Sequence, residues 1–135
     1  MPGLDTNVIM RWLIDDDDAQ TKLAARVFDA AKIDDEPLYV PGTVILELAW
    51  VLQSHYGHSD GELIRVLGAL LETRELEIQN EGALEIALQR FALGTADFAD
   101  CLHAALCRDA DKLPILTFDR KASRLTEFQL LGNRS

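Results

Sequence analysis

Cysteine, proline and basic side chains are scarce in this 135-residue chain. Its two cysteines, Cys101 and Cys107, lie six residues apart on one expected helix, and this separation argues against a disulfide between them. Free thiols fit a reducing cytoplasm. The sequence has no internal repeat and no linker rich in Pro, Gly or Ser, so we expect a single domain over residues 1–135. The hydrophobic fraction of 48% is enough for a real core.

Long apolar runs without charge are also lacking, which argues against a membrane span. We expect no signal peptide, because no cationic segment precedes a long apolar run and Asp5 comes early. Lys and Arg number 13 against 23 acids, a net charge of −10, which weighs against a protein that coats nucleic acid. A nuclease remains compatible with this charge, since acids at a metal site are neutralised when the ion binds. The acidity favours a basic partner.

Short strands alternate with helices along the chain. This pattern is typical of the α/β class, and we expect a short, mainly parallel sheet flanked by helices on both faces. Asn80 and Asp97 are expected N-caps, and the run Asp15–Asp18 is expected to be a solvated loop that supplies another. The expected helices are residues 6–14, 19–32, 43–55, 62–73, 81–91 and 98–111, with a last turn around Ala122, and the expected strands are residues 2–5, 38–41, 76–78, 114–117 and 128–131.

Four acidic stretches lie where a strand ends or a helix begins: Leu4–Asn7, Ile45–Leu48, Asp97–Asp100 and Thr117–Arg120. Each places a carboxylate inside or beside an apolar run, where burial is costly unless the group is paired, protonated or bound to a cation. No matching buried bases are evident, so one shared cation is indicated. Oxygen ligands suit Mg²⁺ or Mn²⁺. Because ligands of parallel sheets collect at the carboxyl ends of the strands, we expect the acids to converge there and at least one to have a raised pKa.

Each acid also has a simpler interpretation. Asp5 can be an N-cap for the first helix. Glu47 can point outward beside Trp50, although its apolar helical neighbours favour a place on or next to the buried stripe. Capping alone is sufficient to explain Asp97. A purely structural role explains Asp100 less well, because it directly precedes an apolar helical segment. Asp119 can be a turn residue paired with one of the bases that follow it.

The histidines give no metal signature. His103 is expected to be an ordinary helix residue, and His55 and His58 have no partner motif. A phosphate-binding glycine loop and a nucleophile elbow are both missing from the sequence.

Taken together, the motifs Leu4-Asp5-Thr6-Asn7-Val8, Leu46-Glu47, Asp97-Phe98-Ala99-Asp100 and Leu116-Thr117-Phe118-Asp119 resemble those of the PIN-domain ribonucleases, in particular the VapC-type toxins of bacterial toxin–antitoxin pairs. The resemblance covers nearly the whole chain. It implies an Mg²⁺- or Mn²⁺-dependent endoribonuclease, a cognate antitoxin partner and a homodimer. The family's acids correspond to Asp5, Glu47, Asp100 and Asp119, with Asp97 as a second candidate for the third position.

The resemblance and the site chemistry together suggest a mechanism. A water activated by one or two divalent ions would attack a phosphate of the RNA in line. Thr6, Asn7 and Thr117 are expected to orient the acids or a bound water. The bases expected near the rim, each with an ordinary surface role as the alternative, are Arg11, Arg120 and Lys121.

Two other classes stay open. One is an Mg²⁺-dependent phosphatase with Asp5 as its nucleophile, although that chemistry wants a second aspartate where Asn7 stands. The other is a catalytically inactive PIN-like module that only binds a partner.

Overall fold

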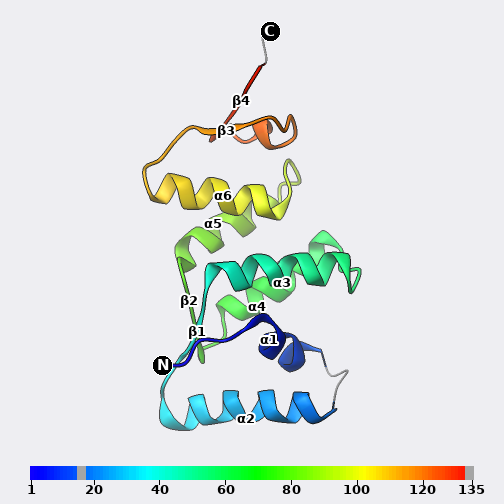
Figure 1. Ribbon diagram of the computed structural model, residues 1–135, viewed down its shortest axis with the longest axis vertical. Coiled ribbons are helices and arrows are strands. Elements are labelled where there is room, and N and C mark those ends of the chain that lie inside the picture. Colours follow the sequence, from blue (N-terminus) through cyan, green and yellow to red (C-terminus); the bar gives the residue numbers. More distant parts are fainter. Residues whose placement is uncertain (15–17, 133–135) are drawn as a thin grey trace. The chain divides into compact units, whose positions relative to one another are not determined.

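The computed structural model describes residues 1–14 and 18–132 (Figure 1). Its elements confirm the α/β class with short parallel strands. Asp15–Asp17, expected to form a loop, lie outside the described residues. The elements in order are α1 (Thr6–Leu13), α2 (Asp18–Asp34), β1 (Leu38–Val40), α3 (Gly42–Ser54), α4 (Asp60–Leu71), β2 (Leu76–Ile78), α5 (Glu81–Phe91), α6 (Phe98–Asp109), β3 (Ile115–Thr117), the 3₁₀ turn η1 (Ala122–Arg124) and β4 (Phe128–Leu130).

The chain divides into two compact units, and the boundary runs through α4. The first unit comprises Met1–Ser59 and Ala69–Gln79, and the second comprises Asp60–Gly68 and Asn80–Ser135. Each unit contains one pair of parallel strands, β1 with β2 and β3 with β4. Across the described residues, no helix has the length and apolar character needed to cross a membrane.

In the first unit, α1 packs on both α2 and α3. The ring of Trp12 stacks on Phe28 with centroids 4.1 Å apart, which joins α1 to α2. The buried stripe of α3 repeats at helical spacing, as expected for a helix that covers a core. It consists of Val44, Ile45, Leu48, Ala49 and Leu52.

The strand expected at residues 2–5 is reduced to a single bridge. Gly3 pairs in parallel with Tyr39, and the Leu4 amide donates to the Tyr39 carbonyl at 2.8 Å. The pairing stops there because Asp5 already serves as the N-cap of α1. This bridge places Asp5 next to the edge of the β1–β2 pair.

In the second unit, α5 packs against α6, and their facing sides are lined by small and apolar residues. The edge-to-face contact of Phe91 and Phe98, with centroids 5.9 Å apart, closes this core. β3 and β4 are linked through η1 and pair in parallel, with Thr117 opposite Leu130.

One expected cap is wrong. Asn80 does precede α5, but its side chain makes no capping hydrogen bond. Its backbone is left-handed, with φ of 53° and ψ of 46°, whereas a side-chain N-cap requires the extended region. Asparagine tolerates the left-handed region better than most residues, so Asn80 serves the turn after β2 instead. Asp97 is extended and caps α6 as expected.

Candidate functional site

Asp5 and Glu47 belong to the first unit and meet through Thr6. Asp5 accepts a hydrogen bond from the Thr6 amide at 2.8 Å, which fixes its side chain at the start of α1. Thr6 is only 4% exposed, and its hydroxyl donates to Oε1 of Glu47 on α3. Glu47 is exposed, as its simpler interpretation proposed. Its carboxylate is nevertheless bonded to Thr6, beside the Asp5 turn.

Asn7 and Arg11 lie in the first and second turns of α1, after the N-cap Asp5. Both line a small cavity of about 250 Å³ between α1 and α2, and Nε of Arg11 donates to Gln20 at 2.9 Å. Arg11 is thus directed towards α2 in this structure. Asn7 is exposed, and a role for it in orienting Asp5 stays a prediction.

Asp97, Asp100 and Asp119 belong to the second unit. The Asp97 side chain accepts from the Asp100 amide at 2.9 Å, which is the N-cap bond of α6. The Thr117 hydroxyl accepts from the Asp119 amide at 3.0 Å, and Asp119 Oδ1 in turn accepts from the Lys121 amide at 2.8 Å. Asp119 is thus a turn residue, as its simpler interpretation proposed, but its bonds go to backbone amides.

These three acids influence one another electrostatically. Partial burial, followed by the negative charge of Asp97, a hydrogen bond with Asp97 and the charge of Asp119, raises the pKa of Asp100 to about 6. His103 acts in the opposite direction and does not outweigh them. The expectation that one of the acids has a raised pKa is confirmed here. A cation bound beside Asp100 would offset the charges of Asp97 and Asp119, which add to the effect of burial on its pKa.

The described residues therefore hold the expected acids in two groups, one in each unit. Carboxylates are the right donors for a hard divalent cation. Even so, no three His, Cys, Asp or Glu side chains within residues 1–14 and 18–132 are gathered closely enough to hold a metal ion. The donor chemistry fits Mg²⁺ or Mn²⁺, whereas the part of the chain that the structure describes shows no preformed cluster of ligands.

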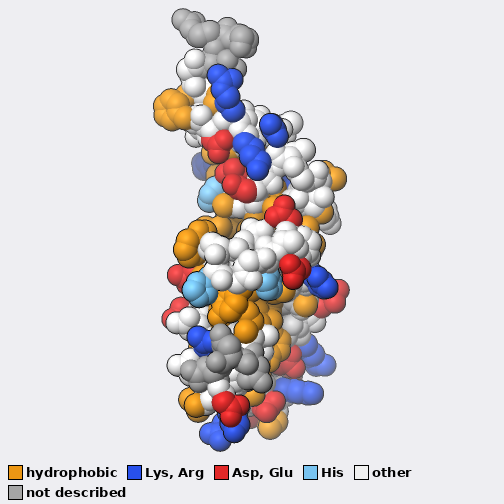
Figure 2. Space-filling view, turned by 90° about the vertical axis from the view of Figure 1, so that its right-hand side faces the viewer, with side chains coloured by type: hydrophobic (Ala, Val, Ile, Leu, Met, Phe, Trp, Pro, Cys, Tyr) orange, Lys and Arg blue, Asp and Glu red, His pale blue; other side chains and the backbone are white. Residues whose placement is uncertain are grey.

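Basic side chains accompany the acids of the second unit. Arg120 and Lys121 directly follow Asp119 and are exposed. Figure 2 shows Lys or Arg, Asp or Glu and hydrophobic side chains close together on the face of the β3–β4 region that it presents. Positive charge for a phosphate backbone is thus available beside Asp119.

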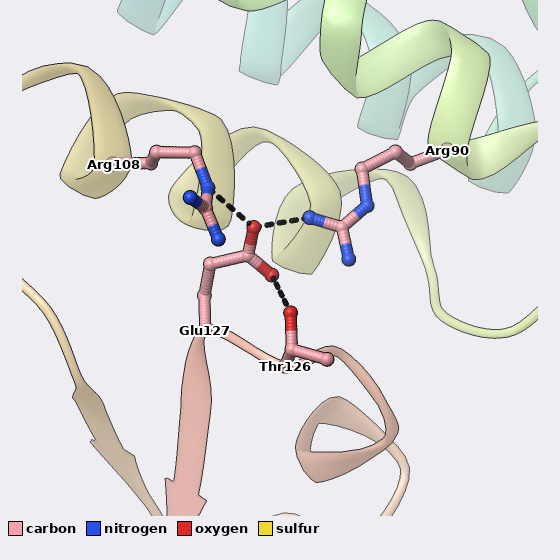
Figure 3. Close-up of polar contacts among 4 residues, drawn as sticks. All are labelled: Arg90, Arg108, Thr126 and Glu127. Atoms are coloured by element: carbon pink, nitrogen blue, oxygen red, sulfur yellow. Dashed lines mark hydrogen bonds and ion pairs between the residues drawn. The ribbon is translucent and has the colours of Figure 1, made fainter.

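The second unit contains a buried carboxylate, Glu127, that links α5 and α6 to the start of β4. The sequence analysis did not single it out. Glu127 is 2% exposed and accepts hydrogen bonds from Arg90 of α5 and, at 2.9 Å, from Nε of Arg108 of α6 (Figure 3). Burial alone would raise its pKa, but the bonds from Arg90 and Arg108 outweigh burial and lower it to about 2. The two arginines also line a cavity of about 820 Å³.

Nothing in the local sequence could have identified Glu127. It stands between Thr126 and a short apolar strand, and its two partners are 37 and 19 positions away. Only tertiary packing brings Arg90 and Arg108 to it.

Comparison with known proteins gives two results. The family model described as "PIN domain" matches residues 4–127. The chain is also 22% identical over 125 residues to a protein named VapC ribonuclease from Aquifex aeolicus (strain VF5), which covers 93% of this chain and 92% of that protein. The matched range includes all five candidate acids and parts of both units.

Proposed function

The chain belongs to the PIN-domain family, and from this premise we propose that it is an Mg²⁺- or Mn²⁺-dependent endoribonuclease that acts as the toxin of a type II toxin–antitoxin pair. The similarity to a protein named VapC ribonuclease supports the RNA substrate and the toxin role. The structural observation that carries the proposal is the partly buried Asp100 beside Asp97 and Asp119, where burial and then the neighbouring charges raise the pKa of Asp100.

The acids proposed to bind the metal and serve the reaction are Asp5, Glu47, Asp100 and Asp119, with Asp97 as an additional ligand. The structure leaves them oxygens to do so. Asp119 uses Oδ1 for backbone amides, which leaves Oδ2 for a cation, whereas Asp97 bonds the Asp100 amide through Oδ1 and shares a side-chain hydrogen bond with Asp100. Glu47 is bonded to Thr6 through Oε1, which likewise leaves Oε2.

A bound divalent ion would stabilise charge on the scissile phosphate and lower the pKa of a water molecule. Side chains of the protein are proposed to position the acids and the RNA. Thr6 orients Glu47, and Thr117 holds the backbone of the Asp119 turn. Arg120 and Lys121 are proposed to hold RNA phosphates, where each contact would make binding weaker at high salt. Arg11 is a weaker candidate because it already bonds Gln20.

The proposed partners follow from the same premise. They are a cognate antitoxin protein and a second copy of this chain, and the proposed location is the cytoplasm. The net charge of −10 supports a basic antitoxin. Large rings are enriched in interfaces, and of those near helix ends Trp50 is 69% exposed, whereas Trp12 stacks on Phe28 and Tyr56 contacts His55 within the chain.

The proposal is tested by incubating structured RNA with wild-type protein and Mg²⁺. Discrete cleavage that EDTA and Asp5→Asn both abolish is the expected result. Asparagine is as good an N-cap as aspartate, so Asp5→Asn should leave α1 intact. Asp29→Asn, at an exposed position of α2, is the matched control and should cleave like wild type.

Two outcomes would contradict the proposal. Hydrolysis of a generic aryl phosphate with RNA left intact would favour the phosphatase mechanism with Asp5 as nucleophile. Equal RNA cleavage by wild type and Asp5→Asn, or none by either across several RNA classes, would favour a binding module.

A further inference from the structure

The cavity beside Glu127 is large enough for a small organic molecule. Its volume is about 820 Å³, and the residues that line it belong to the second unit. Ligand cavities of proteins usually measure roughly 300–1,000 Å³ and combine an apolar wall with a few convergent polar groups. The described lining has both, and it includes Asn80, Ala83, Ile86, Arg90, Ala105 and Arg108.

The wall contributed by α5 and α6 is apolar. Ala83 of α5 and Ala105 of α6 are buried, and Ile86 of α5 is 47% exposed. The cavity is therefore open to solvent beside Ile86. Apolar atoms of a ligand placed against this wall would leave water, which favours binding.

The polar side of the cavity carries an excess of positive charge. The guanidinium groups of Arg90 and Arg108 converge on a single carboxylate, that of Glu127 (Figure 3). Because arginine stays charged at any ordinary pH, two positive charges face one negative charge. Arg90 uses Nη1 and Arg108 uses Nε for these bonds, whereas each guanidinium has five N–H donors. The arginines can therefore bind a second anion without releasing Glu127.

Asp109 also lines the cavity but does not cancel this excess. It is exposed at the end of α6, where water screens its charge. The Arg90 side chain is only 26% exposed, so its charge is screened less. Asn80 adds a neutral amide that makes no capping bond with α5.

We propose that this cavity binds a small organic anion, a molecule with a carboxylate or phosphate group on an apolar body. The charged group binds Arg90 and Arg108, whose planar guanidinium groups match the geometry of such oxyanions. The apolar body lies against the wall of α5 and α6. This site goes beyond the proposed function, because none of the described residues that line the cavity is a candidate acid.

Benzoate and phenylphosphonate are suitable probes, since each joins an oxyanion to an apolar ring. Each is titrated into the full chain in EDTA, and binding is followed by the backbone amide signals in NMR spectra. We expect the signals of Ala83, Ile86 and Ala105 to shift. Benzamide has the shape of benzoate without its charge, and acetate lacks the ring, so both should bind more weakly. Tighter binding of phenylphosphonate would identify a phosphate as the ligand group, and tighter binding of benzoate a carboxylate.

Ile86 allows the charge of the cavity to be changed without removing an arginine or Glu127. Ile86→Glu places a negative charge at the opening and should weaken benzoate binding at least about fivefold relative to the uncharged Ile86→Gln. Ile86→Lys should bind benzoate more tightly than Ile86→Gln. Ile33→Glu makes the same substitution at an 82% exposed position of α2 and is the matched control, which should bind like wild type.

A ligand that binds only the folded chain also stabilises it, so benzoate should raise the Tm of wild type and Ile33→Glu more than that of Ile86→Glu. Equal binding of benzoate and benzamide, or equal binding of benzoate by Ile86→Glu and Ile86→Gln, would overturn the proposal. So would binding of neither probe, or signal changes confined to residues outside the cavity. The comparison of benzoate with benzamide uses wild type alone, so it decides the matter even where a variant fails to fold.

Discussion

At the scale of single residues, Thr6 is the side chain that joins two candidate acids. Its buried hydroxyl donates to Glu47, and its amide donates to Asp5. Thr6→Val keeps the shape and removes the hydroxyl, so we expect a loss of about 1 kcal/mol of stability and a lower rate of RNA cleavage. Thr6→Ser keeps the donor and should retain most of both. Urea unfolding of the two variants checks this, and equal stability of Val and Ser would show that the bond is unimportant.

Asp100 gives a prediction about charge. Burial and the neighbouring acids hold its pKa at about 6, so Asp97→Asn or Asp119→Asn should lower that pKa by removing a negative charge. Asparagine can keep the backbone bonds that each aspartate accepts. Carboxyl-carbon NMR titration in EDTA measures the pKa. An unchanged pKa in both variants would mean that burial alone is responsible.

The sign of the stability effect at Asp100 follows from the direction of its shift. Folding favours the protonated form, so the group stabilises the fold most below its ordinary pKa of 3.8. That contribution is lost as the pH rises from 3.8 to about 6. Stability of wild type relative to Asp100→Asn should therefore fall across this interval.

At the scale of elements, Glu127 ties the start of β4 to α5 and α6. Its pKa is lowered from 4.5 to about 2, which corresponds to about 3 kcal/mol of stability. This contribution is complete above pH 4.5 and is lost as the pH falls towards 2, the reverse of the Asp100 case. Glu127→Gln should cost about 3 kcal/mol at neutral pH, because Arg90 and Arg108 lose their charged partner.

Denaturant unfolding at several pH values measures this effect as the difference between wild type and Glu127→Gln. The difference should shrink below pH 4.5. Glu85→Gln, at an exposed position of α5, is the matched control and should change little. A difference that does not vary with pH would mean that Glu127 acts through packing rather than charge.

Local sequence signals predicted the elements well and their pairing less well. Helix α5 and strand β2 begin and end where the sequence analysis placed them, and Asp97 caps α6. The strand at residues 2–5 and the Asn80 cap were wrong, because the backbone conformation at Asp5 and Asn80 depends on the turns that adjoin them. The link from Thr6 to Glu47 spans 41 positions, and such contacts leave no local pattern.

At the scale of the whole molecule, a single domain stays a prediction, since the contacts divide the chain into two units. The family match extends across both, and α4 is shared between them. We therefore expect one cooperative transition on thermal unfolding, with far-UV circular dichroism and tryptophan fluorescence giving the same midpoint. Two separate midpoints would show that the units fold independently.

The central claim is that the candidate acids bind the divalent metal that RNA cleavage needs, and Mn²⁺ titration calorimetry tests it most directly. Asp5→Asn and Asp100→Asn should each weaken the Mn²⁺ binding of wild type, because each removes a proposed carboxylate ligand. Asp29→Asn should bind like wild type. Mn²⁺ binding as tight in both variants as in wild type would contradict the claim.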